Sequence, residues 1–265
     1  MNEIVEIPIW RLVLAYIFIV FLYIVVKIKG INREKEILMG TIRMSIQLLL
    51  VGYLLMYLFE NPHPLWTLLV IFIMEGFAIH NIYKRSSYPL LKKTKQVIAF
   101  SMIAGTMLSI FYFNLVVVHF SPWYDPRYFI PIGGMIIGNS MTGIALGVNT
   151  LVEGMQSKRP MIEGTLMLGA TPKQATKRLV NQAFDSAILP TINSMIGMGI
   201  VFLPGMMTGQ ILSGVDPLVS IEYQIAIMLG ISGSVALTVL LFTTFGYRTF
   251  FNERNQLIEV EEKEV

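Results

Sequence analysis

Four polar side chains fall in the middle of apolar stretches of this chain, where they could do chemistry. Glu75 lies eleven residues after Pro64, so a helix starting there would carry it about 16 Å along its axis. Gln47 and Asn139 lie at depths of roughly 13 Å in two other stretches, and Asn193 is about halfway along a fourth. Oxygen ligands at one level suit a hard cation such as iron(II) or manganese. We hypothesise that these four side chains line a path across a membrane.

Other interpretations of the same residues stay open. Amides within a helix bundle also form interhelical hydrogen bonds that merely hold the bundle together. A carboxyl at membrane depth is costly, and Glu75 could serve as the proton or cation relay of an ion-coupled transporter or channel. Gly138-Asn139-Ser140 is faintly similar to the serine site of intramembrane proteases, so an intramembrane enzyme is a third alternative. The sequence shows no identifiable general base that could activate this serine for such an enzyme.

The elements that must position these residues are long apolar stretches. Hydrophobic residues make up 54% of the 265-residue chain and charged residues only 14%, against about 25% charged in soluble domains. A membrane span needs roughly 20 mostly apolar residues. The sequence therefore predicts an all-α integral membrane protein with about seven transmembrane helices, at 8–27, 38–59, 64–83, 97–119, 129–152, 183–204 and 219–247.

Charge placement predicts the orientation of these spans. Most Lys and Arg residues fall in alternate connecting segments, and positive residues mark the cytoplasmic side. This predicts an N-terminus outside and a C-terminus inside, where residues 251–265 would form a disordered cytoplasmic tail. The net charge of +3 is too small to suggest nucleic acid, and the lack of cysteine excludes thiolate chemistry.

The longest inside segment, about 153–182, has the marks of two short helices. Gly169 can end a helix that contains Glu163, because glycine tolerates the left-handed cap. Thr171 and Pro172 are then an N-cap and a first helical residue, followed by Lys173. The predicted result is a rigid cytoplasmic elbow that passes force from a partner to the sixth span. The alternative is an amphipathic helix lying in the membrane interface.

The segment after the sixth span is too broken for a straight helix. It begins Pro204-Gly205-Met206-Met207 and ends at Asp216-Pro217. Irregular backbone at membrane depth is tolerated only against protein or a water-filled cavity. We expect a turn or a short re-entrant element at the outer mouth, and hypothesise that the first four residues form a gate.

Several segments resemble known permeases. Residues 163–170 are similar to the EAA loop of bacterial importer permeases, in which a glutamate precedes a glycine by six residues. Over nearly the whole chain the sequence resembles the FetB-type permeases, the bacterial iron-export family related to plant aluminium-tolerance permeases. The carrying segments are 45–53, 130–141, 168–175 and 203–217.

We expect a single permease domain at 1–250 in a bacterial cell membrane. A permease of this size usually needs two copies to enclose a path, so we also expect a homodimer. The resemblance implies an iron-export function powered by a separate ABC ATP-binding subunit that docks at the elbow. The chain lacks the phosphate loop Gly-x-x-x-x-Gly-Lys-Ser/Thr. We therefore expect a transport protein rather than an enzyme, with no cofactor of its own and with ATP used by the partner.

Overall fold

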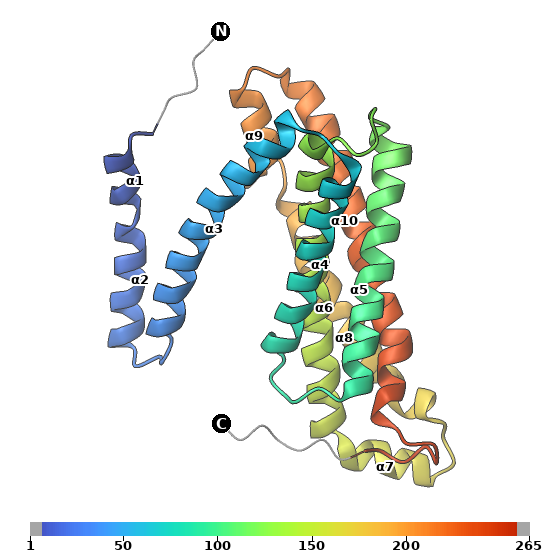
Figure 1. The fold of residues 1–265 in the computed structure, drawn as a ribbon. Coiled ribbons are helices and arrows are strands. Elements are labelled where there is room, and N and C mark those ends of the chain that lie inside the picture. Colours follow the sequence, from blue (N-terminus) through green and yellow to red (C-terminus); the bar gives the residue numbers. More distant parts are fainter. Residues whose placement is uncertain (1–6, 259–265) are drawn as a thin grey trace.

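A computed structural model describes residues 7–258, which are almost wholly helical and contain no strand (Figure 1). The elements in chain order are α1 Ile9–Ala15, α2 Ile17–Ile28, α3 Glu34–Glu60, α4 Pro64–Arg85, α5 Lys92–Tyr112, the π-helix Phe113–Val118, α6 Pro126–Ser157, α7 Arg159–Met167, α8 Pro172–Gly197, α9 Gly205–Leu212, α10 Pro217–Gly246 and the 3-10 helix Tyr247–Phe250. The prediction of an all-α membrane protein is confirmed.

Six stretches in the described part of the chain are long and apolar enough to cross a membrane. They are Ile9–Ile28, Glu34–Glu60, Pro64–Arg85, Lys92–Val118, Pro126–Ser157 and Pro217–Phe250. These six correspond to six of the seven predicted spans. The remaining one is α8, which packs along α6 and α10 but has a polar first half. The count of seven spans and the orientation stay predictions.

The end predicted for the sixth span, residue 204, is wrong, while the helix that carries this span begins at Pro172 as the elbow prediction required. The helix ends at Gly197. Residues 198–204 leave the helix because Gly199 adopts a φ of +81°, a conformation that side-chain-bearing residues rarely take. The N–H of Gly199 then donates to the carbonyl of Phe202 at 3.0 Å, which closes a turn.

The helix α6 is the centre of the bundle and packs against α4, α5, α8 and α10. Its Gly-x-x-x-Gly pair, Gly143 and Gly147, forms the seam. A Cβ on Gly143 would come within 2.8 Å of Val235 on α10, and one on Gly147 would come within 3.4 Å of the Ala183 carbonyl on α8. Small residues therefore let three helices approach closely where lipid supplies no hydrophobic drive.

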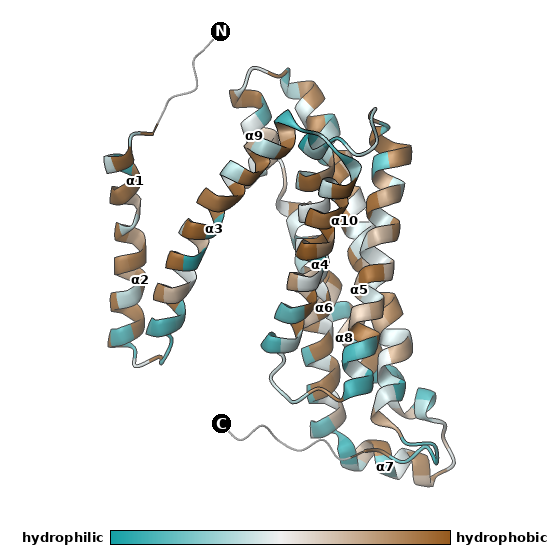
Figure 2. Cartoon of the chain, viewed as in Figure 1, coloured by the Kyte–Doolittle hydropathy of each residue, from teal (hydrophilic) through white to brown (hydrophobic). Residues whose placement is uncertain are grey.

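The first three helices stand apart from this bundle as a hairpin (Figure 1). Of their described residues only Val26 and Leu58 are buried. The Tyr16 and Ser45 hydroxyls join the two arms at 2.6 Å. The exposed surface of the hairpin is mostly apolar, as Figure 2 shows in brown, and such a surface suits contact with lipid tails or with another membrane protein.

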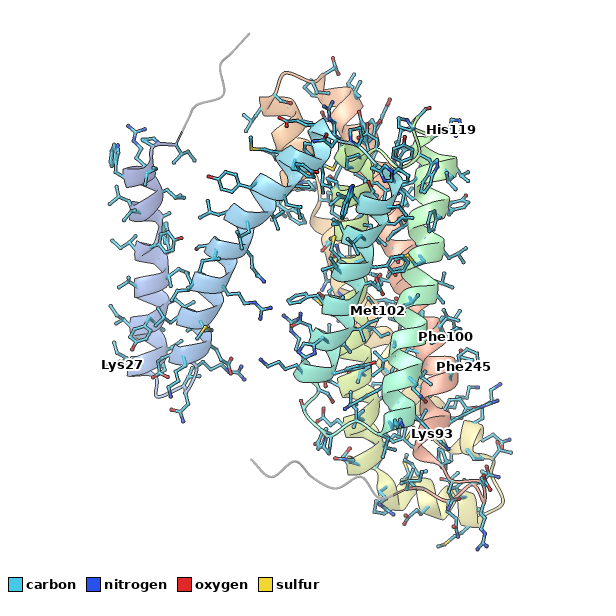
Figure 3. The ribbon with its side chains drawn as sticks, in the orientation of Figure 1. Lys27, Lys93, Phe100, Met102, His119 and Phe245 are labelled. Carbon is cyan, nitrogen blue, oxygen red and sulfur yellow. The ribbon has the colours of Figure 1, made fainter. Side chains whose placement is uncertain are left out.

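The basic connecting segments gather at one end of the molecule. Lys27 and Lys93 lie toward the end where α7 is found, whereas His119 lies at the opposite end, with α9 (Figure 3). This is the arrangement that the predicted inside segments require.

The chain continues past α10 into a folded turn rather than directly into a tail. Phe251 and Leu257 form an isolated bridge, and the Ile258 N–H donates to the Phe250 carbonyl at 2.8 Å. The predicted disordered tail at 251–265 thus begins with an ordered segment at 251–258. Its remainder, 259–265, lies outside the described residues.

Candidate coupling elbow and membrane-depth polar residues

The elbow between α7 and α8 is built by a complete glycine cap. Gly169 has a φ of +89° and donates its N–H to the Leu166 carbonyl at 2.9 Å. The Ala170 N–H donates to the Thr165 carbonyl at 3.3 Å. These two bonds form the Schellman motif, which satisfies carbonyls that a helix end leaves without partners. The prediction that Gly169 ends the first elbow helix is confirmed.

The start of α8 is fixed by an N-terminal capping box. The Gln174 N–H donates to Thr171 Oγ1 at 3.3 Å, and the Thr171 N–H donates to Gln174 Oε1 at 2.9 Å. Pro172 is the first helical residue, as predicted. The sequence reasoning missed Gln174, although the Thr-x-x-Gln pattern is the known signature of this box. Capped on both sides, the junction holds α7 and α8 in a defined relation.

Glu163 and Lys173 lie on either side of this junction. Glu163 Oε1 accepts a hydrogen bond from Arg159 Nε at 2.8 Å, an ion pair between successive turns of α7. Lys173 is exposed, directly after Pro172. The EAA-like glutamate therefore stiffens the first elbow helix.

Two large apolar side chains project from the tip of the elbow. Met167 is 86% exposed and Leu168 is 91% exposed. Both lie at the end of the molecule where the basic segments gather. The sequence analysis did not single them out as contact residues, although two apolar residues directly before a capping glycine are a usable signal. Exposed apolar groups surrounded by polar ones mark interaction sites.

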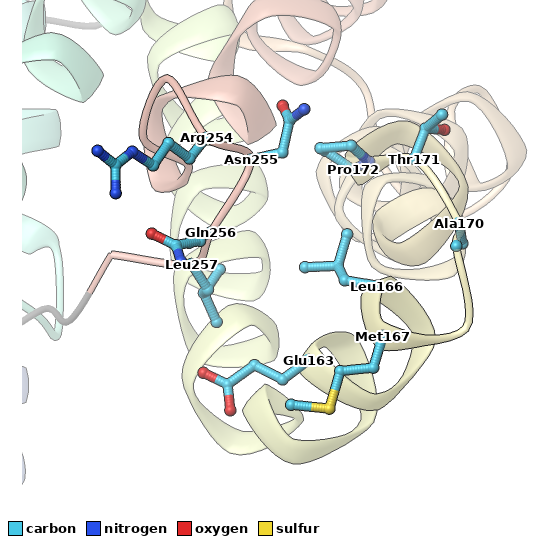
Figure 4. A pocket seen from close by; sticks show the side chains of 11 residues that line it. Glu163, Leu166, Met167, Ala170, Thr171, Pro172, Arg254, Asn255, Gln256 and Leu257 are labelled. Atoms are coloured by element: carbon cyan, nitrogen blue, oxygen red, sulfur yellow. The ribbon is translucent and has the colours of Figure 1, made fainter.

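A hollow of about 620 Å³ lies between the elbow and the turn after α10 (Figure 4). Glu163, Leu166, Met167 and the Ala170–Pro172 segment form one wall. Residues 254–257 form the other wall, opposite the elbow. The elbow is thus one side of a composite surface, and the sequence analysis did not foresee the other side.

Glu75 lies inside the bundle, not on its surface. It is 2% exposed and its Oε2 accepts a hydrogen bond from Thr106 Oγ1 of α5 at 3.0 Å. Its Oε1 has no hydrogen-bond partner among the described residues. The Thr106 hydroxyl also lies 2.8 Å from the Met102 carbonyl, so its single hydrogen serves two acceptors. Glu75 is thus weakly satisfied and faces α5.

The three amides predicted to share the path with Glu75 are all exposed. Gln47 lines an apolar groove of about 500 Å³ between α3, α4 and α6, together with Phe77 and Gly138. Asn139 follows Gly138 directly and donates to the Met135 carbonyl at 2.7 Å. Asn193 is exposed on the neighbouring helix α8. The structure brings Gln47 and the Asn139 segment together, and it does not bring Glu75 into this groove.

The described residues contain no group of three His, Cys, Asp or Glu side chains that could hold a metal ion. The segment predicted as a gate has the broken backbone that was expected, because α9 starts at Gly205 after Pro204. Met207 is buried, and Met206 packs against the core.

Comparisons with known proteins agree over almost the whole chain. The model of the uncharacterised protein family UPF0014 matches residues 9–251. The chain is 34% identical to the probable iron export permease protein FetB of Escherichia coli, over 95% of each protein. It is 34% identical to the membrane protein YjkA of Bacillus subtilis, over 94% of this chain and 97% of YjkA. It is 31% identical to the protein ALUMINUM SENSITIVE 3 of Arabidopsis thaliana, over 86% of this chain and 82% of that protein. No solved structure matches.

These relatives confirm the resemblance to FetB-type permeases. Together with the six apolar helices they make the chain a multi-pass protein of a bacterial cell membrane with a transport function. Because the family model covers residues 9–251, nearly the whole chain, this chain belongs to the uncharacterised protein family UPF0014.

Proposed function

We propose that this chain is the membrane-spanning subunit of an ATP-driven metal exporter whose ATP-binding subunit is a separate protein. The observation that carries the proposal is the elbow. A capped junction with exposed Met167 and Leu168 at its tip leads directly into α8, which packs on α6 and α10. Force applied at the tip therefore reaches the centre of the bundle without crossing a flexible segment.

The path lies between two copies of the chain in this proposal. Gln47, Asn139 and Asn193 are exposed on the surface of one copy. Lipid tails offer no hydrogen bonds, so an amide facing them carries a desolvation cost. A second copy, with water held between the two, removes that cost. The closely packed core around α6 offers no comparable route inside one copy.

We propose iron or a related divalent metal as the cargo. The name of the Escherichia coli relative supports iron, and the oxygen ligands of the amides are compatible with a hard cation. Neutral amides hold a hydrated cation loosely, which suits a route that a cation must leave as readily as it enters. With two copies of the chain, each of these amides would line the path twice, once from each copy. The family likeness supports the ATP-binding partner and the absence of enzymatic activity in this chain.

Reconstitution tests the proposal. The permease and an ABC ATP-binding subunit from the same organism are placed in proteoliposomes, and ATP hydrolysis is followed with iron(II), manganese(II), zinc(II) and no metal. The expected result is hydrolysis stimulated by one of these metals, with metal movement that requires ATP. Metal movement that continues without ATP and stops when the proton gradient is collapsed would overturn it.

Glu75 is the observation that favours a second function. A carboxyl that is 2% exposed, with one oxygen lacking a partner, could relay a proton or cation in an ion-coupled transporter. The two functions differ in what a neutral residue at this position does. Glu75→Gln would abolish ion-coupled transport, whereas ATP-driven transport along the exposed amides would continue.

A further inference from the structure

We propose that the turn after α10 is a second contact of the ATP-binding subunit, so that the subunit holds the elbow and the C-terminal turn together. This inference rests on the proposed function and adds a second part to the surface on which the ATP-binding subunit would dock. It concerns residues 251–257, here called the C-terminal turn. The partner surface it requires is an apolar depression with an acidic rim.

The C-terminal turn is internally organised around Asn252. Its Oδ1 accepts hydrogen bonds from the N–H groups of Arg254 and Gln256, both at 2.9 Å. Its Nδ2 donates to Gln256 Oε1 at 2.9 Å. Asn255 takes the left-handed conformation, with a φ of +58°, which asparagine tolerates better than most residues. The turn therefore presents its outer side chains in a fixed arrangement.

The turn is also anchored to the membrane bundle. Phe250 is 3% exposed and Phe251 is 8% exposed, and both belong to the main hydrophobic core. Just before them, the Thr249 hydroxyl lies 2.7 Å from the Thr94 hydroxyl of α5. Movement of the turn is thus tied to α10 and α5, much as movement of the elbow is tied to α8.

The elbow and the turn form one surface with two hollows. The hollow of about 620 Å³, shown in Figure 4, and a second one of about 550 Å³ share Thr171, Pro172 and Asn255 as lining residues. The first hollow also contains Met167, one of the two exposed residues at the tip. A partner that receives this tip would therefore also meet the turn.

The charge of this surface indicates what the partner must supply. Lys173 and Arg248 line the second hollow and Arg254 lines the first. The ion pairs among residues 7–258 are Arg33–Glu36 and Arg159–Glu163, so these three cations have no carboxylate partner there. Glu253 lines the second hollow, and Glu163 is already paired with Arg159. The surface thus has an excess of positive charge around an apolar tip.

Residues 259–265 lie outside the described part of the chain, and their sequence contains four glutamates. They would compete with the ATP-binding subunit for the same cations. Deleting 259–265 separates the two sources of carboxylates, because a competing tail would lower the affinity for the subunit, and its removal would raise it.

The ATP-binding subunit for this test is the one that gives metal-stimulated hydrolysis in the reconstitution. Its affinity for full-length permease in lipid nanodiscs is measured. Arg254→Glu perturbs the turn, Leu168→Ser perturbs the elbow, and Lys29→Glu is a charge-matched control in the distant hairpin. We expect Arg254→Glu to raise the Kd at least tenfold and to flatten its dependence on salt, while Lys29→Glu binds as the unchanged protein does. Because the chain has no cysteine, Glu253→Cys, at an exposed position of the same turn, can carry a photo-crosslinker, which should attach to the subunit.

The possible results distinguish failure of the second contact from failure of the proposed function. If Leu168→Ser weakens binding but Arg254→Glu does not, and Glu253→Cys forms no crosslink, the second contact is refuted and the elbow contact stands. If Arg254→Glu leaves the affinity unchanged in the chain without residues 259–265 as well, the subunit does not contact these cations and the inference is again refuted. If neither Leu168→Ser nor Arg254→Glu weakens binding, both contacts are refuted, whereas the proposed function itself fails only if no ATP-binding subunit gives metal-stimulated hydrolysis in the reconstitution.

Discussion

Leu168 offers the sharpest test of the elbow as a docking point. The side chain is 91% exposed, so Leu168→Ser removes almost no packing within the chain and should change the free energy of unfolding by less than about 0.5 kcal/mol. If the ATP-binding subunit buries this side chain, the lost transfer free energy is about 1.5–3 kcal/mol. At 1.4 kcal/mol per tenfold change, the Kd should rise by about 10- to 100-fold.

The assay is equilibrium binding of the ATP-binding subunit to permease in nanodiscs, with thermal stability measured on the same samples. Ile31→Ser is the matched control, because Ile31 is a 49% exposed apolar residue in the α2–α3 connection, away from the elbow. A Kd for Leu168→Ser within twofold of the control, at unchanged stability, would refute the reasoning.

Three further changes test the capping, the packing and the buried carboxyl. Thr171→Ala removes the capping box with Gln174, which should cost about 1 kcal/mol and lower the ratio of metal-stimulated to basal ATP hydrolysis. Gly105→Ala would place a methyl group against the Thr238 methyl carbon and 3.0 Å from its Cα, so the thermal midpoint in detergent should fall by the equivalent of about 1–3 kcal/mol. Glu75→Gln keeps the volume of the side chain, and ATP-driven metal transport should stay within about twofold of the unchanged protein.

Each of these changes has its own control or contrary outcome. Thr165→Ala lies on the same elbow but outside the capping box, so a similar loss of coupling there would contradict the capping argument. Gly138→Ala meets no atom within 4 Å and should leave stability unchanged, which separates close packing from a general intolerance of alanine. A complete loss of transport in Glu75→Gln would favour the ion-coupled alternative.

Local patterns predicted the helices and the elbow well, because they depend on near neighbours in the chain. The glycine cap at Gly169 and the N-cap at Thr171 are decided within a few residues, and both formed as predicted. Apolar length located six of the helices in the same way. The end of α8 could not be located by length, since it depends on the backbone conformation of Gly199.

Local sequence patterns could not predict how the polar residues are arranged in space. Indexing along each helix gives depth, but not the face on which a side chain lies relative to other helices. Glu75 and Gln47 were assigned similar depths, yet Glu75 bonds to Thr106 on α5, whereas Gln47 lines a groove between α3, α4 and α6. The folding of the C-terminal turn onto the elbow likewise depends on long-range packing of Phe251, which no motif in the tail signals.

The central claim is that the elbow faces the cytosol and receives the ATP-binding subunit there. The most direct measurement is labelling of Met167→Cys by a membrane-impermeant maleimide, since this would be the only cysteine of the chain. The account predicts labelling in inverted vesicles but not in intact cells, with protection when the ATP-binding subunit is added in excess. Labelling from outside intact cells, or labelling in inverted vesicles that the bound subunit leaves unchanged, would contradict it.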